Sequence, residues 1–226
     1  MNIIVSGASR GIGAALIKKL DALGHKTLAI SRSRNALEEL KKKGKLITII
    51  AADINQSDFS DQILPVLEQW QKVDVIINNA GQLLNKPFIR TTTDDFLTLF
   101  QANVLTAINL IQACTPFLVK GSHIVNISSM GGVNKSLKFP GLSAYSTSKG
   151  ALTVLTECLA EEYKEIGAHV NALALGSVHT EMFKLAFPNF EAAAGVEEMA
   201  NYIADFALNG SALFNGKIIP VAVTNP

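Results

Sequence analysis

The alternation of short, apolar, β-branched runs with longer segments of helical period is the feature that most constrains the fold of this chain. Strands are expected over residues 2–6, 26–31, 46–51, 73–78, 123–128, 169–174 and 217–221. Nearly continuous apolar runs of this kind are typical of a parallel sheet covered on both faces. Helices are expected between them, over residues 11–23, 34–43, 57–71, 93–119, 144–166 and 196–208.

Regular alternation of strand and helix predicts an α/β fold with right-handed crossovers. We expect a doubly wound, Rossmann-type three-layer sandwich with a mostly parallel seven-stranded sheet. The chain shows no internal repeat, low-complexity segment or linker, and 226 residues suit one folding unit. Residues 1–226 are therefore predicted to form a single domain.

Composition and charge exclude several classes of protein. The chain is 48% hydrophobic and 17% charged with a net charge of +1, which disfavours nucleic acid or a membrane surface as the main partner. We expect no run that spans a bilayer and no room for a signal peptide before the first strand, hence a cytoplasmic protein. Cys114 and Cys158 are expected to be reduced thiols in the core. The four histidines do not cluster, so no metal site is predicted.

A glycine-rich turn follows the first predicted strand and opens the first helix. It reads Ser6-Gly7-Ala8-Ser9-Arg10-Gly11-Ile12-Gly13. Glycines at these spacings let the backbone approach a pyrophosphate, which the amides and positive end of the helix would bind. A glycine trio alone is weak evidence, but the strand before it and the helix after it supply the context that the motif needs.

The end of the second strand decides which dinucleotide would bind. A site for NAD usually places a carboxylate there for the ribose hydroxyls. This chain has Ser31 and Arg32 instead, and Arg10 in the glycine turn adds a second guanidinium. Because arginine binds phosphate in a forked, charge-assisted way, the pair predicts a 2′-phosphate pocket and hence NADP(H). The alternative is two solvated surface arginines.

Tyr145 and Lys149 lie four residues apart at the start of a predicted helix, so both project from one face. A phenol with a pKa near 10 is a poor proton relay at neutral pH unless a neighbouring cation favours the phenolate. Ser128 and Ser129 end the strand that precedes this helix. Ligands of such sheets bind at the carboxyl ends of strands, so these side chains predict an acid–base site.

Further motifs extend along nearly the whole chain to about Met182. They are Asp53-Ile54, Asn78-Asn79-Ala80-Gly81, Asn103, Asn126-Ile127-Ser128-Ser129, Tyr145-Ser146-Thr147-Ser148-Lys149, and Val170-Asn171-Ala172 leading to Gly176. In this order and context they resemble the short-chain dehydrogenase/reductase family in its compact single-domain form. Each motif alone is unspecific, whereas together they are highly specific.

The resemblance implies a role for each matching residue. Tyr145 would exchange the proton, Lys149 would lower its pKa and hold the nicotinamide ribose, and Ser129 would hydrogen-bond the reacting oxygen. Asn103 would hold a water that links Lys149 to solvent. The remaining implied contacts are Asp53 and Ile54 beside the adenine, Asn79, Ala80 and Gly81 along the adenine ribose, and Val178 and Thr180 at the carboxamide. Asn78 is expected to stabilise the sheet.

Several segments depart from the family pattern. Leu175 stands where proline is frequent, and the loop before Tyr145 carries Lys135 and Lys138, interpreted as solvated or else as attracting an anionic substrate. The phenylalanine-rich segment 181–195 is short for a lid and predicts an apolar, fairly open pocket. Without a glycine-rich C-terminal tail, a homodimer through helices 93–119 and 144–166 is the default expectation, and a homotetramer is the alternative.

The sequence thus predicts an NADP(H)-dependent oxidoreductase that interconverts a small-molecule carbonyl and an alcohol. One alternative is a non-catalytic regulator that senses NADP(H). Such proteins usually lose the tyrosine or lysine, and both are present here. The other is an epimerase or dehydratase, for whose substrate domain the residues after Gly176 leave little room. Fold analogy does not name the substrate.

Overall fold

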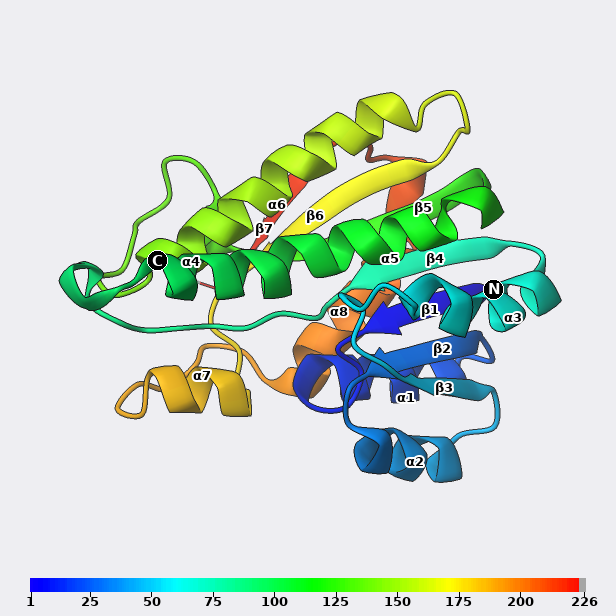
Figure 1. The fold of residues 1–226 in the computed structure, drawn as a ribbon, viewed down its shortest axis with the longest axis horizontal. Helices are drawn as coiled ribbons and strands as arrows, with labels where there is room; N and C mark the ends of the chain where they lie inside the picture. Colours follow the sequence, from blue (N-terminus) through cyan, green and yellow to red (C-terminus); the bar gives the residue numbers. More distant parts are fainter. Residues whose placement is uncertain (224–226) are drawn as a thin grey trace.

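The computed structural model describes residues 1–223 and contains one seven-stranded sheet (Figure 1). Its order is β3-β2-β1-β4-β5-β6-β7, and every pairing is parallel. The strands are β1 Asn2–Ser6, β2 Lys26–Ser31, β3 Ile47–Ala51, β4 Val73–Asn78, β5 Leu118–Ser129, β6 His169–Leu175 and β7 Ile218–Val221. The predicted doubly wound α/β fold is confirmed, with a sheet that is wholly rather than mostly parallel.

Helices cover both faces of the sheet. They are α1 Gly11–Ala22, α2 Arg34–Lys43, α3 Phe59–Trp70, α4 Thr93–Phe100, α5 Thr106–Cys114, α6 Ser143–Glu162, α7 Glu181–Ala186 and α8 Val196–Asn209. One apolar core lies between the sheet and α1, α2 and α8, with Leu16, Leu37 and Ile203 fully buried. A second lies under α3, α5 and α6 and includes Ile63 and Leu110. With one core on each face of the sheet, the fold has three layers: helices, sheet and helices.

The prediction of one helix over residues 93–119 is wrong. The structure has α4, a π-helical turn Gln101–Leu105, α5 and a 3-10 turn Thr115–Phe117, after which β5 begins at Leu118. Pro116 lacks an amide hydrogen and so cannot continue the α-helix, and the chain becomes extended from Leu118 onward. The helical period of an apolar segment does not distinguish a π turn from an α-helix.

Two smaller expectations also need correction, and one short helix is new. Cys114 is buried, but Cys158 is exposed, because α6 turns Leu152, Thr156 and Ala160 inward instead. The short helix α7 was not predicted. By length and composition the helical stretch Thr93–Phe117 could cross a membrane, contrary to the expectation of no such run. In the structure α5 packs against α3 and β4, as a core helix of a globular protein does.

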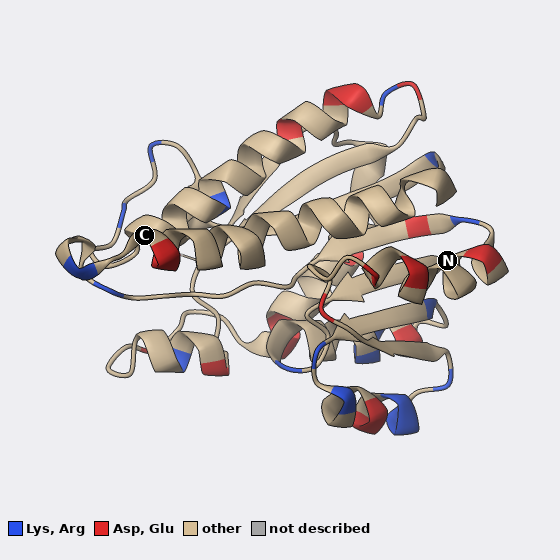
Figure 2. Cartoon of the chain, viewed as in Figure 1, with Lys and Arg blue, Asp and Glu red and all other residues tan. Residues whose placement is uncertain are grey.

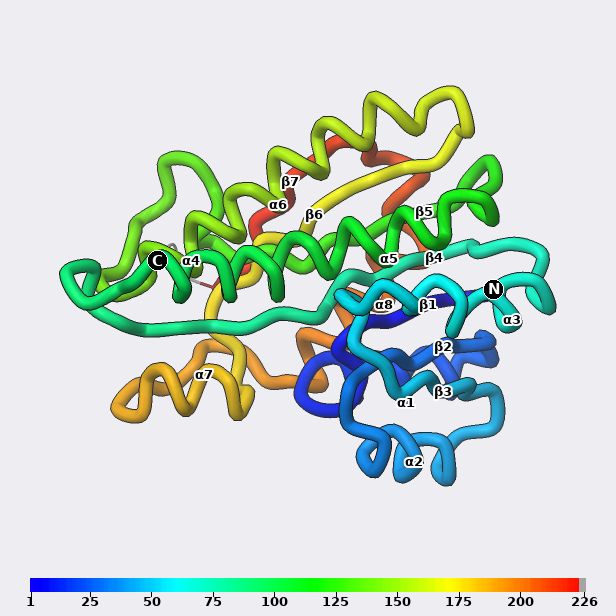
Figure 3. Tube along the Cα trace, in the orientation of Figure 1, coloured from blue at the N-terminus to red at the C-terminus, as the bar shows by residue number. Residues whose placement is uncertain are grey.

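The carboxyl ends of all seven strands lie at one edge of the sheet. The connections that follow β4, β5 and β6 leave at this edge, and α7 projects from it (Figure 3). The strand order reverses between β1 and β4, since β1 is followed by β2 on one side and pairs with β4 on the other. Ligands of doubly wound sheets bind at such a reversal, so the fold predicts a ligand site at this edge.

Candidate active site

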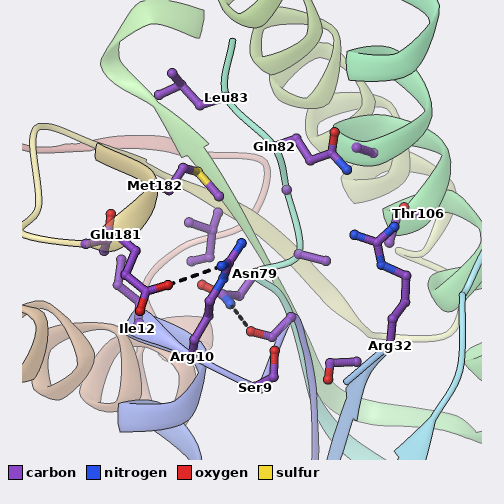
Figure 4. Close-up of a pocket in the computed structure, with 18 of the residues that line it drawn as sticks. Ser9, Arg10, Ile12, Arg32, Asn79, Gln82, Leu83, Thr106, Glu181 and Met182 are labelled. Atoms are coloured by element: carbon purple, nitrogen blue, oxygen red, sulfur yellow. Dashed lines mark hydrogen bonds and ion pairs between the residues drawn. The ribbon is translucent and has the colours of Figure 1, made fainter. Parts of the chain in front are cut away.

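A cleft of about 880 Å³ opens at the carboxyl edge of the sheet. It brings together residues from six different connections. Nearly all the predicted site residues line it: Gly7, Ser9, Arg10, Gly11, Ile12, Ser31, Arg32, Asp53, Ile54, Asn79, Ala80, Gly81, Ser129, Tyr145, Lys149, Val178 and Thr180. Gly13 and Asn103 lie behind its wall. Figure 4 shows part of the lining, with Leu83 and Met182 also facing the cleft.

The glycine turn fits a phosphate group. Gly7 and Gly11 adopt φ angles of 66° and 52°, where a side chain would be strained. A Cβ on Gly13 would lie 2.2 Å from the carbonyl oxygen of Gly7, so the third glycine lets the turn close onto the helix. The side chain of Arg10, the N-cap residue of α1, makes no hydrogen bond to the first amides of the helix. These amides therefore remain available for an anion at the helix N-terminus.

Asn79 holds the glycine turn against the end of β4. Its Nδ2 donates to the carbonyl oxygens of Ser6, at 3.1 Å, and Gly7, at 3.2 Å. Its main-chain amide donates to Ser6 Oγ. Behind it Asn78 Nδ2 donates to Asn126 Oδ1 at 2.8 Å, within the sheet. Asn78 thus ties β4 to β5, in keeping with its expected role, and Asn79 shapes the turn as well as lining the cleft.

The end of β5 places two serines with different surroundings. Ser128 is 2% exposed, and its Oγ donates to the main-chain oxygen of Lys149 at 3.1 Å, which fixes α6 on the strand. Ser129 lines the cleft, and its Oγ accepts a hydrogen bond from the amide of Gly131. The alternation of strand side chains explains the difference. Ser129 is accordingly the serine that can reach a bound molecule.

Tyr145 and Lys149 enter the cleft from the first turns of α6. Lys149 is only 5% exposed, and its Nζ donates to the carbonyl oxygen of Ile127 at 2.8 Å. Burial lowers the pKa of this lysine to about 8. Burial also raises the pKa of the Tyr145 phenol, while a hydrogen bond with Ser129 opposes that rise. The expected lowering of the tyrosine pKa is therefore not what the protein groups alone produce.

Asn103 sits in the π-helical turn and is 1% exposed. Its Oδ1 accepts from the amide of Gln82 at 2.7 Å, and its Nδ2 donates to Gln82 O and Ser148 Oγ. A Cβ built on Gly81 would lie 2.8 Å from Asn103 Oδ1 and 3.3 Å from Lys149 Nζ. The side chain thus clamps the segment after β4 beside the lysine.

Comparison with known proteins agrees with this geometry. The family model described as short chain dehydrogenase matches residues 1–189. The chain belongs to the short-chain dehydrogenase family. It is 30% identical over 201 residues to the carbonyl reductase [NADPH] 2 of Sus scrofa, covering 88% of this chain and 80% of that protein. It is 33% identical over 190 residues to the 2-(R)-hydroxypropyl-CoM dehydrogenase of Xanthobacter autotrophicus, covering 79% and 75%.

A solved structure supports the same assignment. The dehydrogenase/reductase from Sinorhizobium meliloti superposes with a TM-score of 0.85 at 25% identity, covering 98% of this chain and 93% of that one. Short-chain dehydrogenases are oxidoreductases that use nicotinamide cofactors, and this chain is an oxidoreductase of that family. Within residues 1–223 no group of three histidine, cysteine or acidic side chains could hold a metal ion.

The two arginines of this short-chain dehydrogenase have different surroundings. Arg10 Nη1 lies 3.1 Å from Glu181 Oε2, and both side chains are exposed. Arg32 leaves the end of β2 and extends along the cleft toward Thr106 (Figure 4). It makes no ion pair in the described part of the chain. The structure thus shows both guanidiniums at the cleft, one of them engaged by a carboxylate that the sequence did not mark as a partner.

Part of the cleft wall beyond the glycine turn is apolar. Thr180 Oγ1 accepts from the amide of Phe183 and caps α7, which carries Met182 and Phe183 into the cleft lining. The rings of Phe183 and Phe187 lie 5.2 Å apart. Met182, Phe183 and Leu83 give the pocket an apolar face, and Phe187 packs behind Phe183. Lys138 Nζ donates to Val133 O and Ser136 Oγ within its own loop, which favours the solvated-loop interpretation.

Proposed function

We propose that this short-chain dehydrogenase is an NADP(H)-dependent oxidoreductase that interconverts a carbonyl and an alcohol. It acts as a single cytoplasmic domain over residues 1–226. The observation that carries the proposal is the meeting of Ser129, Tyr145 and Lys149 in the cleft that also contains the glycine turn. Acid–base groups and an anion-binding helix end are the two components that hydride transfer from a dinucleotide requires.

In the proposed reaction the bound nicotinamide supplies or accepts the hydride. Tyr145 donates its phenolic proton to the carbonyl oxygen during reduction, or takes the proton of the alcohol during oxidation. Ser129 Oγ donates a hydrogen bond to the same oxygen as negative charge develops on it. Ser129 and Tyr145 both line the cleft, so both can act on the same oxygen of a bound substrate.

Lys149 places a positive charge behind the tyrosine. Its pKa of about 8 leaves it largely protonated at neutral pH, and so it stabilises the phenolate that forms when Tyr145 gives up its proton. Asn103 acts as a positioning residue, since its bonds to Gln82 and Ser148 hold the neighbouring main chain. A water held at this turn would return the proton to Lys149 from solvent.

NADP(H) is favoured over NAD(H) by the charges at the end of β2. Ser31 and Arg32 occupy the place where a carboxylate would bind the ribose hydroxyls, and both line the cleft. Arg10 approaches from the glycine turn. Two guanidiniums suit a phosphate far better than a pair of hydroxyls. The Sus scrofa relative is named as an NADPH carbonyl reductase, which supports the same choice.

The apolar wall suggests the kind of substrate. Leu83, Met182 and Phe183 line the cleft, and such side chains exclude water from a reacting carbonyl. We propose a small uncharged carbonyl or alcohol as the substrate. The loop lysines Lys135 and Lys138 have no assigned contact with it.

The test combines cofactor binding with one substitution. Titration with NADPH and NADH, followed by nicotinamide fluorescence, is expected to give at least tenfold tighter binding of NADPH, as one charge-assisted phosphate contact would produce. Tyr145→Phe is expected to reduce carbonyl-dependent NADPH oxidation at least a hundredfold. The same variant should bind NADPH as tightly as the unchanged protein.

Other results would overturn parts of this proposal. Equal binding of the two cofactors would remove the NADP(H) assignment. Retained turnover in Tyr145→Phe would remove the acid–base assignment. Tight NADPH binding without turnover of any carbonyl compound would favour the non-catalytic regulator.

A homodimer is the proposed assembly. From Phe96 to Val119 the sequence has no charged residue, and α5 and the middle of α6 appear without charges in Figure 2. Leu97 on α4 is 61% exposed, and Val154 on α6 is 57% exposed. An exposed, uncharged, apolar face on two adjacent helices suits a self-complementary contact between two copies.

A further inference from the structure

One ion pair joins the glycine turn to the short helix α7. Arg10 precedes the first residue of α1, and Glu181 is the first residue of α7, 171 positions later in the chain. Their Nη1 and Oε2 atoms lie 3.1 Å apart (Figure 4). The pair therefore connects the element that would bind phosphate with the element that brings Met182 and Phe183 to the cleft lining.

This ion pair occupies a group that the proposed function assigns to the cofactor. A guanidinium presents its donors as a planar fork, and the donor bound to Glu181 is not available to a phosphate at the same time. Arg32 has no such competitor within residues 1–223. The two arginines of the expected 2′-phosphate pocket thus differ in their availability, because only Arg10 must break an ion pair with a carboxylate before it binds the phosphate.

Because both side chains are exposed, Arg10 can readily release Glu181 and bind a phosphate instead. The side chains of Arg10 and Glu181 are 66% and 72% exposed, so water already solvates both groups. An exposed pair of this kind contributes at most about a fivefold factor to an equilibrium. The pair is strong enough to modulate binding and too weak to prevent it.

We propose that Glu181 is a specificity-determining residue of the cofactor site, which competes with the cofactor 2′-phosphate for Arg10. The inference rests on the proposed NADP(H) function. NADPH binding breaks the ion pair, whereas NADH has no 2′-phosphate and leaves it in place. Glu181 therefore lowers the preference for NADPH over NADH, and occupation of the 2′-phosphate pocket releases the first turn of α7 from the glycine turn.

The first experiment measures dissociation constants of NADPH and NADH for the unchanged protein, Glu181→Gln, Arg10→Gln and the double variant. Glu181→Gln is expected to tighten NADPH binding about two- to fivefold and to change NADH binding less. In the Arg10→Gln background the same substitution should have no effect, since the competition requires the arginine. Glu191→Gln is the matched control, because it removes the same charge from the same segment at an exposed residue.

The second experiment measures amide hydrogen exchange of residues 182–186 without any redox chemistry. Adenosine 2′,5′-bisphosphate should speed exchange there in the unchanged protein, and adenosine 5′-monophosphate should not. Glu181→Gln should show fast exchange with neither ligand added.

The outcomes separate this inference from the function on which it rests. An unchanged protein that fails to prefer NADPH overturns the proposed function. A protein that prefers NADPH, but whose NADPH affinity and α7 exchange are the same in Glu181→Gln, overturns the role of Glu181 alone. Equal tightening of NADPH and NADH, or tightening by Glu191→Gln as well, would show a general charge effect and would also overturn it.

Discussion

Lys149 carries its charge where burial disfavours it. The side chain is 5% exposed, its single hydrogen bond in the described structure goes to Ile127 O, and its pKa falls to about 8 from an ordinary 10.5. Tyr145 has its pKa shifted upward by burial. In the protein without ligands both groups therefore favour their uncharged forms more than they would in water. The cation remains because neutral pH still lies below the lysine pKa.

This arrangement predicts a pH dependence for reduction. Lowering the lysine pKa means that the ammonium is present below about pH 8 and is lost as the pH rises through that value. The tyrosine, with its raised pKa, stays protonated over the same window. We expect kcat/KM for NADPH, which reports groups of the free enzyme, to fall about tenfold per pH unit above pH 8.

Lys149→Arg is the control for this profile. Its guanidinium stays charged at every pH tested, so the fall should move to higher pH even though the rate is lower. A profile for the unchanged protein that is flat to about pH 10, or the same fall in the arginine variant, would contradict the assignment to Lys149.

Residues of the site differ in how far the sequence could reveal them. The glycine turn, Tyr145, Lys149 and Ser129 stand at strand ends, and parallel strands bring their carboxyl ends to one edge. The Arg10–Glu181 ion pair could not be predicted, because it joins two connections that are 171 residues apart and depends on where α7 lies. The direction of the Tyr145 pKa was also hidden, because it depends on burial more than on the neighbouring lysine in sequence.

At the scale of elements, the junction of β1 and α1 depends on the third glycine of the turn. A Cβ on Gly13 would lie 2.2 Å from Gly7 O and 2.6 Å from Asn79 Nδ2. The first neighbour is backbone, which cannot move aside without opening the turn. Gly13→Ala is therefore expected to lower the free energy of unfolding by about 2–3 kcal/mol, measured by urea denaturation, and to weaken NADPH binding at least tenfold.

Gly150→Ala is the matched control for this substitution. Gly150 lies within α6, and the nearest atom to an added Cβ is Gly132 O at 3.5 Å, an ordinary contact. Alanine favours a helix by up to about 1 kcal/mol over glycine, so this variant should be as stable or more stable. Equal stability of Gly13→Ala and the unchanged protein would show that the turn adapts and that the glycine is not required.

The errors in the predicted fold lie in elements that no local sequence pattern marks. The π turn at Gln101–Leu105 places Asn103 against Gln82, and no residue in it marks the change from α-helix in the sequence. The helix α7 is only six residues long and depends on the Thr180 cap and on the Asn85–Ala186 hydrogen bond. The other six strands match their predicted ranges closely, because nearly every side chain in a parallel strand covered on both faces is apolar, whereas β5 begins at Leu118, ahead of its predicted start at residue 123.

At the scale of the whole molecule, the uncharged face of α4, α5 and α6 is exposed in the single chain. Burying such a face between two copies would remove apolar surface from water without removing any charge. The proposed homodimer predicts that Leu97→Glu, a change at an exposed position, leaves the fold intact. It should weaken dimerisation at least a hundredfold, since two carboxylates would enter a symmetric contact. Sedimentation equilibrium over a range of concentrations measures this.

Leu23→Glu separates a specific effect from a general effect of added charge. Leu23 is 49% exposed and caps α1 on the opposite face of the sheet, so its replacement should leave the dimer unchanged. Circular dichroism of both variants establishes that they fold. A monomeric unchanged protein at every concentration, or a Leu97→Glu variant that dimerises as well as Leu23→Glu, would show that this face does not join two copies. Assembly beyond the dimer that survives Leu97→Glu would instead indicate a second interface elsewhere, as a tetramer requires.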